Sequence, residues 1–198
     1  MNYKNSDIKL YIITICMALF VGAVFLFGFF RQKEISFFNT PKETESPVQS
    51  ISSLRGESCE NYKTRPIAVM LASDPAARPL SGISQADISI EMPVTPDGVT
   101  RIMAIFQCNQ PSEIGSVRSA RVDFLSLVAS FGAIYAHWGG EHGALEQLDN
   151  GILDNLDAIK NKYDEYFRKK GIKAPHNGFT SYDLIENATK KYNYSLID

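Results

Sequence analysis

The sequence has few of the residues that usually carry metal binding or nucleophilic catalysis. Its 198 residues include three histidines, three cysteines and one tryptophan. The signatures of a serine-hydrolase elbow, G-x-S-x-G, and of the glycine-rich nucleotide-binding loops are absent. The stretch HWGGEH places three residues between His137 and Glu141, whereas the helical zinc motif needs two, so these side chains would not share a helical face. We therefore expect no metal and no cofactor.

The sequence also lacks an excess of charge of either sign. Twenty Lys and Arg residues are balanced by 22 Asp and Glu residues, which gives a net charge of −2. Nucleic-acid binding normally needs a basic face, so we expect no nucleic-acid partner. The composition, 44% hydrophobic and 21% charged, is typical of a globular protein, and the length suggests one domain with appendages.

One long apolar run, LYIITICMALFVGAVFLFGFF, lies at 10–30 and contains no charged residue. As a helix it rises about 31 Å, the hydrocarbon thickness of a bilayer. A cleaved signal peptide has an apolar region of only about 7–15 residues, so we interpret 10–30 as an uncleaved transmembrane anchor behind a short tail, 1–9. Cys16 follows Thr and Ile rather than the small residues of a lipoprotein cleavage site, so lipidation is not expected. Counting the flanking Lys and Arg residues does not decide the orientation of the anchor.

Two regions follow the anchor. Residues 31–64 are rich in Ser, Glu, Pro and Lys and show little apolar periodicity, which predicts a flexible linker. Residues 65–198 alternate apolar segments with turn signals. Strands are predicted at 66–72, 86–94, 99–107 and 133–138, and helices after 116, at 141–151 and at 181–192, the last capped by Thr180 or Ser181. We expect one α+β domain with a mixed or antiparallel sheet and packed helices.

The stretch IGSVRSAR, 114–121, is expected to open the first helix of this domain. Arg118 and Arg121 would then lie in the first helical turn, where a cation opposes the helix dipole by roughly 0.3–1 kcal/mol. Ser116 and Ser119 are expected to cap the helix. The arrangement suggests that an anion sits between the two arginines, either a ligand or one of the protein's own carboxylates.

Polar residues in or beside loops define a candidate anion site, because arginine forks suit carboxylate and phosphate. Its members are Arg78, Ser81, Arg101, Arg118, Ser119, Arg121, His137, Gly139, Gly140, His176 and Asn177. The alternative is a partly buried internal network in which carboxylates neutralise arginines. Its members would be Asp87, Glu91 and Asp123 with Arg101, Arg118 and Arg121. The two glycines are either a plain turn or a place where a ligand approaches the backbone. Both alternatives stay open here.

Cys59 and Cys108 are the two cysteines outside the apolar run. They either form a disulfide in an oxidising compartment or remain two unrelated buried thiols. The sequence alone does not decide between these alternatives.

Five segments, taken in order, resemble the N-terminal domain of the YerB-like family of bacterial cell-surface proteins, many of them predicted lipoproteins, whose domain is of unknown function. They are RPIAVMLASDPAARPLSGISQADISIE (65–91), GVTRIMAIFQ (98–107), IGSVRSAR (114–121), YAHWGG (135–140) and APHNGFTS (174–181). The resemblance implies an α+β domain outside the cytoplasmic membrane. It therefore implies a single-pass anchor with the C-terminal domain outside, and it favours a disulfide between Cys59 and Cys108. Many members begin with a lipidation motif, where this chain has the apolar run.

The leading functional hypothesis is a membrane-anchored, non-catalytic module of the bacterial envelope. It would bind an anionic envelope ligand, such as peptidoglycan or its precursors, or a cell-wall synthesis protein. A second hypothesis is an envelope polymer hydrolase or transferase in which Glu91 or Asp87 acts as acid or base with His137 or His176. A third is a structural partner protein with no small ligand.

Overall fold

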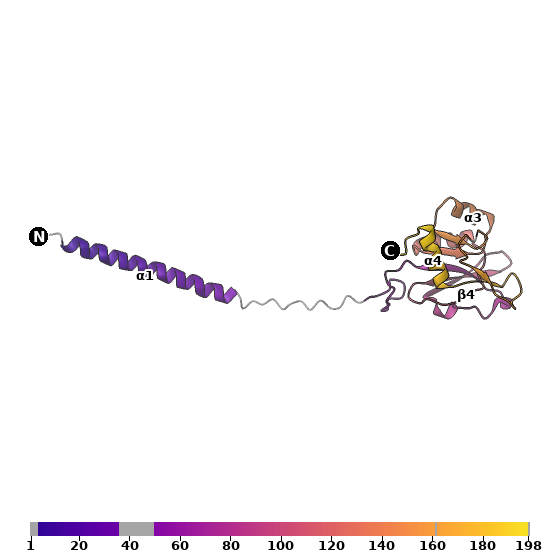
Figure 1. The fold of residues 1–198 in the computed structure, drawn as a ribbon, viewed down its shortest axis with the longest axis horizontal. Coiled ribbons are helices and arrows are strands. Elements are labelled where there is room, and N and C mark those ends of the chain that lie inside the picture. Colours follow the sequence, from indigo (N-terminus) through magenta and orange to yellow (C-terminus); the bar gives the residue numbers. More distant parts are fainter. Residues whose placement is uncertain (1–3, 36–49, 161, 198) are drawn as a thin grey trace. The chain divides into compact units, whose positions relative to one another are not determined.

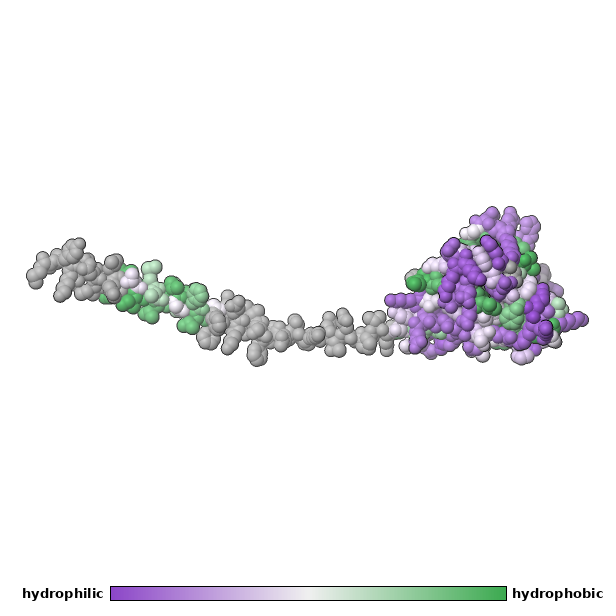
Figure 2. Space-filling model, in the orientation of Figure 1, coloured by the Kyte–Doolittle hydropathy of each residue, from purple (hydrophilic) through white to green (hydrophobic). Residues whose placement is uncertain are grey.

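The computed structural model describes residues 4–35, 50–160 and 162–197 (Figure 1). The chain divides into two units, Met1–Val48 and Gln49–Asp198. The first unit contains helix α1, Lys4–Ile35. Its phenylalanines Phe20, Phe25 and Phe27 are 73%, 79% and 74% exposed, and Figure 2 shows a mostly apolar surface along this part of the helix. Among the residues that the structure describes, no helix has both the length and the hydropathy needed to cross a membrane.

The second unit is built on a five-stranded mixed sheet with the order β2-β3-β1-β5-β6. The strands are β1 Ile67–Ala72, β2 Ile88–Pro93, β3 Thr100–Phe106, β5 Ile134–His137 and β6 Asn155–Asp157. β3 pairs antiparallel with β1 and β2, whereas β5 runs parallel to β1 and β6. The predicted α+β domain with a mixed sheet is therefore confirmed.

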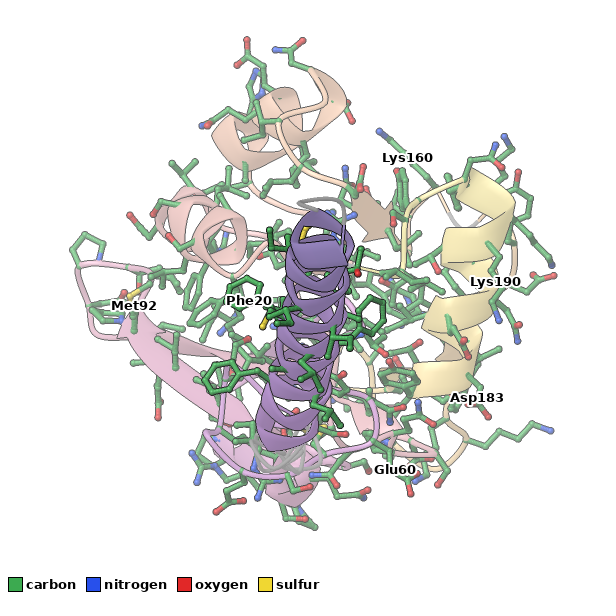
Figure 3. All side chains as sticks on the ribbon, turned by 90° about the vertical axis from the view of Figure 1, so that its left-hand side faces the viewer. Phe20, Glu60, Met92, Lys160, Asp183 and Lys190 are labelled. Carbon is green, nitrogen blue, oxygen red and sulfur yellow. A yellow bond between two sulfur atoms is a disulfide. The ribbon has the colours of Figure 1, made fainter. Side chains whose placement is uncertain are left out.

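Helices cover both faces of this sheet because every other side chain of the central strands points to the opposite face. Helices α2, Val122–Ser130, and α3, His142–Asp149, pack on the face that carries Met70, Met103 and Tyr135. Helix α4, Tyr182–Tyr192, packs on the other face, against Val69 and Leu71. Figure 3 shows Asp183 and Lys190 on the outward side of α4. The Ser181 hydroxyl caps α4 by accepting a bond from the Leu184 N–H at 3.2 Å.

A second, three-stranded sheet has the order β4-β8-β7. Its strands are β4 Ile114–Gly115, β7 Phe167–Arg168 and β8 Gly178–Thr180, and short 3-10 turns lie at Pro75–Ala77 and Ile83–Gln85. Neither β4 nor β8 is among the strands predicted from the sequence. Strands of two or three residues are too short to show an alternating pattern, which explains both errors.

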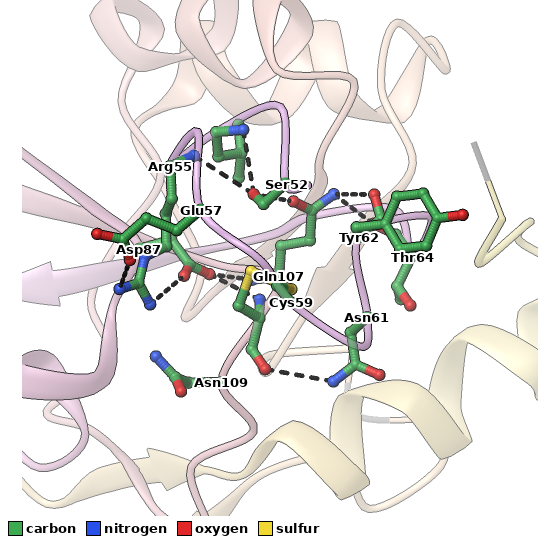
Figure 4. The surroundings of a disulfide bond; sticks show 12 residues. Ser52, Arg55, Glu57, Cys59, Asn61, Tyr62, Thr64, Asp87, Gln107 and Asn109 are labelled. Atoms are coloured by element: carbon green, nitrogen blue, oxygen red, sulfur yellow. Dashed lines mark hydrogen bonds and ion pairs between the residues drawn. A yellow bond between two sulfur atoms is a disulfide. The ribbon is translucent and has the colours of Figure 1, made fainter. Parts of the chain in front are cut away.

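Residues 50–64 are packed on the domain, although the sequence analysis assigned them to the flexible linker. Ser52 is buried and donates a hydrogen bond from its hydroxyl to Gln107 Oε1 at 2.8 Å. Cys59 and Cys108 form a disulfide with a Cα–Cα distance of 5.6 Å (Figure 4). Leu54 packs against the core, but most of the contacts that hold this segment are polar or covalent, so its composition resembles that of a linker. The predicted linker also starts too early, because α1 continues to Ile35; residues 36–49 lie outside the described residues.

Helix α2 begins later than predicted. Arg121 is its N-cap residue and Arg118 lies in an extended segment before it, so neither arginine occupies the first helical turn. The main chain of Arg118 is instead hydrogen-bonded to the sheet. Its N–H donates to Met70 O at 2.8 Å, and its carbonyl accepts from Trp138 N at 2.9 Å. The proposed serine caps are also wrong, since Glu141 Oε1 accepts the bond from Val122 N at 2.7 Å. The dipole argument therefore does not explain the arginines.

Candidate functional site

The segment 116–121 crosses the carboxyl ends of the parallel strands β1 and β5. Val117 pairs with Leu71 at the end of β1, and Ala120 pairs with Gly140 just after β5. On its other side, Val117 N donates to Gly178 O of β8 at 2.8 Å. Ligands of open α/β sheets bind at the carboxyl ends of the strands. The side chains of residues 116–121 therefore lie where a ligand of such a sheet would bind.

Three arginines approach one another at this edge. Arg101 is the second residue of β3, opposite Ala72 at the end of β1, and is only 6% exposed. Burial lowers the pKa of Arg101, and the positive charges of Arg118 and Arg121 lower it further, against the opposing effect of Asp74. The charges of the three side chains thus act on one another, which defines a region of positive potential.

The carboxylates near these arginines are not the predicted ones. Arg101 Nη1 lies 3.6 Å from Asp74 Oδ2, and Arg121 Nη1 lies 3.5 Å from Glu141 Oε2. These pairings have no signature in the sequence, because Asp74 lies in a loop and Glu141 belongs to the HWGGEH stretch that was weighed as a zinc motif.

Asp87 and Glu91 are engaged elsewhere and Asp123 forms no ion pair among the described residues, so the predicted internal network is wrong. The Asp87 side chain is buried, accepts bonds from Gln107 N at 2.5 Å and Cys108 N at 2.9 Å, and lies 3.5 Å from Arg55 (Figure 4). Glu91 Oε1 accepts a bond from the Thr100 hydroxyl at 2.5 Å. Both carboxylates anchor the hairpin of β2 and β3 and the segment 50–64, which is a structural role.

A small polar pocket opens beside the arginine group. It has a volume of about 110 Å³ and is lined by Val117, Arg118, Ser119, Trp138, Arg168 and Pro175. We call it the arginine pocket. Within the part of the chain that the structure describes, neither Arg118 nor Arg168 forms an ion pair. The pocket therefore presents two guanidinium groups without carboxylate partners.

Neutral contacts hold both pocket arginines. Arg118 Nη1 donates to Pro175 O at 3.3 Å, while its Nε is buried without a hydrogen-bond partner among the described residues. Arg168 lies 4.4 Å over the Trp138 ring and donates from Nη1 to Asn177 Oδ1 at 2.6 Å. The sequence analysis missed Arg168, since the stretch 161–171 shows no clear periodicity. Asn177, a predicted site residue, acts as a support for Arg168.

Trp138 forms the wall of the pocket because a glycine lies against it. A Cβ atom on Gly178 would come within 2.5 Å of the Trp138 ring. The edge of Trp138 also meets Tyr166 at a centroid distance of 5.7 Å. The small strand β8 therefore fixes the position of the ring on which Arg168 rests.

His137, Gly139 and Gly140 do not contribute to the pocket, which corrects the prediction for these three residues. The His137 side chain is fully buried, with Nδ1 2.8 Å from Gly139 O and Nε2 3.2 Å from Asn155 Oδ1. Burial lowers the pKa of His137 despite the opposing charge of Asp157. Asp157 Oδ1 accepts bonds from Gly139 N at 2.7 Å and Ile159 N at 2.9 Å. We call His137, Gly139, Asn155, Asp157 and Ile159 the histidine cluster; its hydrogen bonds are directed inward.

Gly140 is required by packing. A Cβ atom on Gly140 would lie 3.0 Å from Leu145 and 3.1 Å from Ala120. The space that a Gly140 side chain would need is therefore already filled by other residues of the protein, and no ligand is needed to explain the glycine. The two glycines therefore form a plain structural turn, which is the first of the two alternatives that the sequence left open.

Arg78 and Ser81 are also separate from the arginine pocket. Arg78 lines a shallow groove of about 690 Å³ with Glu91 and Ile102. Ile102 and Arg101 are neighbours on β3 and point to opposite faces of the sheet, so Arg78 and Arg101 do not share a site. Ser81 donates from its hydroxyl to Glu113 Oε1 at 2.7 Å.

His176 follows Pro175, which lines the pocket, and its Nδ1 is buried without a hydrogen-bond partner among the described residues. No hydrogen bond or ion pair joins either His137 or His176 to Asp87 or Glu91 among the residues that the structure covers. The carboxylate and histidine pairs of the hydrolase hypothesis are therefore not assembled. Of the predicted residues, the structure brings together Arg101, Arg118, Ser119 and Arg121, with Asn177 in support.

Comparison with known proteins agrees with this fold. Residues 53–195 match the family model described as "Protein of unknown function (DUF3048) N-terminal domain". "Putative lipoprotein YerB" of Bacillus subtilis (strain 168) is 36% identical over 183 residues, which are 92% of this chain and 53% of that protein. The crystal structure of the YerB protein from Bacillus subtilis matches with a TM-score of 0.71 and 38% identity, over 75% of this chain and 51% of that one. The chain thus spans about half the length of this curated relative.

Proposed function

The chain belongs to the DUF3048 family, and from this premise we propose that it is a membrane-tethered, non-catalytic module that binds an anionic component of the bacterial envelope through the arginine pocket. One observation carries the proposal: Arg118 and Arg168 face one small pocket without a carboxylate partner among the described residues. Arg118 is partly buried, where charged side chains are normally paired, and the exposed Arg168 adds its charge at the mouth of the pocket. An anionic ligand would supply the missing partner.

The lining of the pocket supports binding over catalysis. It offers two arginines and Ser119 as hydrogen-bonding side chains, together with Val117, Trp138 and Pro175. A hydroxyl needs an adjacent base to become a nucleophile, and the described lining contains neither a carboxylate nor a histidine. Arginine has no proton to exchange near neutral pH. These groups are suited to holding a negative charge in place.

The tether is proposed from residues 10–30. They form part of α1, their described apolar side chains are exposed, and their uncharged length matches a bilayer. The disulfide of Cys59 and Cys108 supports an oxidising compartment for the second unit. The curated relative bears the name of a lipoprotein, so a lipid on Cys16 is the competing anchor. A Cys16→Ser variant that stays in the membrane fraction of bacterial cells after alkaline carbonate extraction supports the helix; release into the soluble fraction supports the lipid.

Binding is tested with the full chain in detergent micelles and soluble peptidoglycan fragments or lipid-linked precursors. Replacing both Arg118 and Arg168 by Ala is expected to weaken binding about 100-fold or more, because each charge-assisted contact contributes roughly 1.5–3 kcal/mol. Arg78→Ala is the matched control, since Arg78 is an exposed arginine in the separate groove. Equal loss of binding in both variants, or in neither, contradicts the assignment of the arginine pocket.

A further inference from the structure

The arginine pocket also indicates the chemical class of its ligand, an inference that rests on the proposed function. Four guanidinium groups lie at this edge of the sheet: Arg118 and Arg168 in the pocket, and Arg101 and Arg121 next to Arg118. Only two carboxylates pair with them, Asp74 and Glu141. The described site therefore carries an excess of two positive charges.

We propose that the arginine pocket binds a doubly charged phosphoryl group, either a terminal phosphate or a diphosphate. A terminal phosphate carries about two negative charges near neutral pH and a diphosphate between about two and three, so either compensates the excess of the site. A single carboxylate carries one charge and would leave half of the excess uncompensated. A phosphoryl group also has several acceptor oxygens, and two arginines and the Ser119 hydroxyl offer donors from different directions.

The size of the pocket supports the same class. Its volume of about 110 Å³ is well below the roughly 300–1,000 Å³ of pockets that enclose drug-sized ligands. One or two phosphoryl tetrahedra fit this space, whereas a disaccharide with its peptide does not. The ligand would insert its charged group only, and the molecule attached to that group would remain outside the pocket.

The geometry of the two pocket arginines favours a fixed anion. Arg168 is held between the Trp138 ring at 4.4 Å and Asn177 Oδ1 at 2.6 Å, and Arg118 is held by Pro175 O at 3.3 Å. Each guanidinium keeps further N–H groups free of ion pairs in the described structure. Side chains that are already positioned lose less conformational entropy when a ligand binds.

The test uses the full chain in micelles of an uncharged detergent at pH 6 and constant ionic strength. At this pH both inorganic pyrophosphate, the probe, and succinate, the dicarboxylate control, carry about two negative charges. Trp138 is the only tryptophan of the chain and lines the pocket, so its fluorescence reports binding directly. We expect pyrophosphate to bind at least about tenfold more tightly than succinate. The double variant Arg118→Ala, Arg168→Ala should lose about 100-fold in pyrophosphate affinity, while Arg78→Ala keeps it.

The outcomes separate the two proposals. If succinate binds as tightly as pyrophosphate, the phosphoryl class is wrong and the anion site stands. If neither anion binds, and the double variant keeps wild-type affinity for peptidoglycan fragments, both proposals fail.

Farnesyl diphosphate distinguishes the source of the phosphoryl group: tighter binding than pyrophosphate supports a lipid-linked diphosphate, and equal binding supports a soluble phosphate ester. Arg118→Lys, which keeps the charge and loses the fork, should weaken pyrophosphate binding by about tenfold.

Discussion

The histidine cluster and the arginine pocket lie at the same end of the same sheet, and they differ in whether their polar groups are satisfied. In the histidine cluster both ring nitrogens of His137 and the Oδ1 atom of Asp157 have partners inside the protein. In the arginine pocket, Arg118 and Arg168 have neutral contacts and no described carboxylate. Satisfied polar groups stabilise a fold, whereas charged groups without a charged protein partner are available to bind a ligand. The comparison predicts that changes in the first cluster alter stability and changes in the pocket alter binding.

The largest effect on stability is expected at the disulfide, which links residues 50–64 to the domain. Cys108→Ser opens a loop with a sequence separation of 49 residues. In the chain-entropy model this lowers the free energy of unfolding by about 4 kcal/mol. Urea unfolding of the full chain measures the change, and Cys16→Ser is the control because Cys16 is a free thiol. Equal unfolding midpoints for Cys108→Ser and wild type would show that the bond does not hold the segment.

Asp157→Ala tests the histidine cluster. It removes the acceptor of two main-chain N–H groups, those of Gly139 and Ile159, and should lower the free energy of unfolding by roughly 2–4 kcal/mol. Asp157→Asn keeps an oxygen acceptor and should cost about 1 kcal/mol. Denaturant titration compares the two variants. A stability equal to wild type in Asp157→Ala would break the distinction between the two regions.

Gly178→Ala tests whether the wall of the pocket depends on close packing. The added Cβ would meet the Trp138 ring at 2.5 Å, so the ring must move, at a cost of about 1–3 kcal/mol. The fluorescence spectrum of Trp138 and the thermal unfolding midpoint report the two effects. Gly143→Ala is the matched control, since its Cβ would lie 3.3 Å from a flexible Val122 methyl. An unchanged spectrum in Gly178→Ala would show that Trp138 is not held as described.

The pH dependence of stability provides a smaller effect. Burial lowers the pKa of His137 in the folded state, so the unfolded chain binds more protons below its own pKa of about 6.5. Stability should therefore fall as the pH falls below about 6.5, by at most about 1.4 kcal/mol per pH unit from this group. Unfolding measured at several pH values between 7 and 5 should show a shallower slope in His137→Asn. Identical slopes would contradict the assignment.

The sequence predicts most of the sheet and little of the site. The runs at 66–72 and 99–107 are long enough to show their type, and they appear as β1 and β3. The arginine pocket depends on β4, β7 and β8, whose two or three residues carry no readable period. Arg168 reaches the pocket only through β7, so no local pattern could have placed it beside Arg118.

The sequence also does not reveal which polar residues are satisfied. His137 and Arg118 both stand next to turn residues and both suit an anion, yet one is fully buried with partners and the other lines a pocket. The difference depends on Asn155 and Asp157, which β6 brings to His137 through its pairing with β5. Long-range pairing of this kind has no signature in the spacing of residues along the chain.

The free energy of unfolding of the double variant Arg118→Ala, Arg168→Ala, determined by urea titration of the full chain, tests the central claim most directly. Neither side chain has an ion-pair partner in the described structure, and the charge of Arg118 opposes that of Arg101. The variant loses neutral contacts to Pro175 O and Asn177 Oδ1, whose small contributions are partly offset when the repulsion between Arg118 and Arg101 is removed. We therefore predict a value within about 1 kcal/mol of wild type, together with loss of anion binding. A loss of about 2 kcal/mol or more would contradict the account, because the arginines would then hold the fold together.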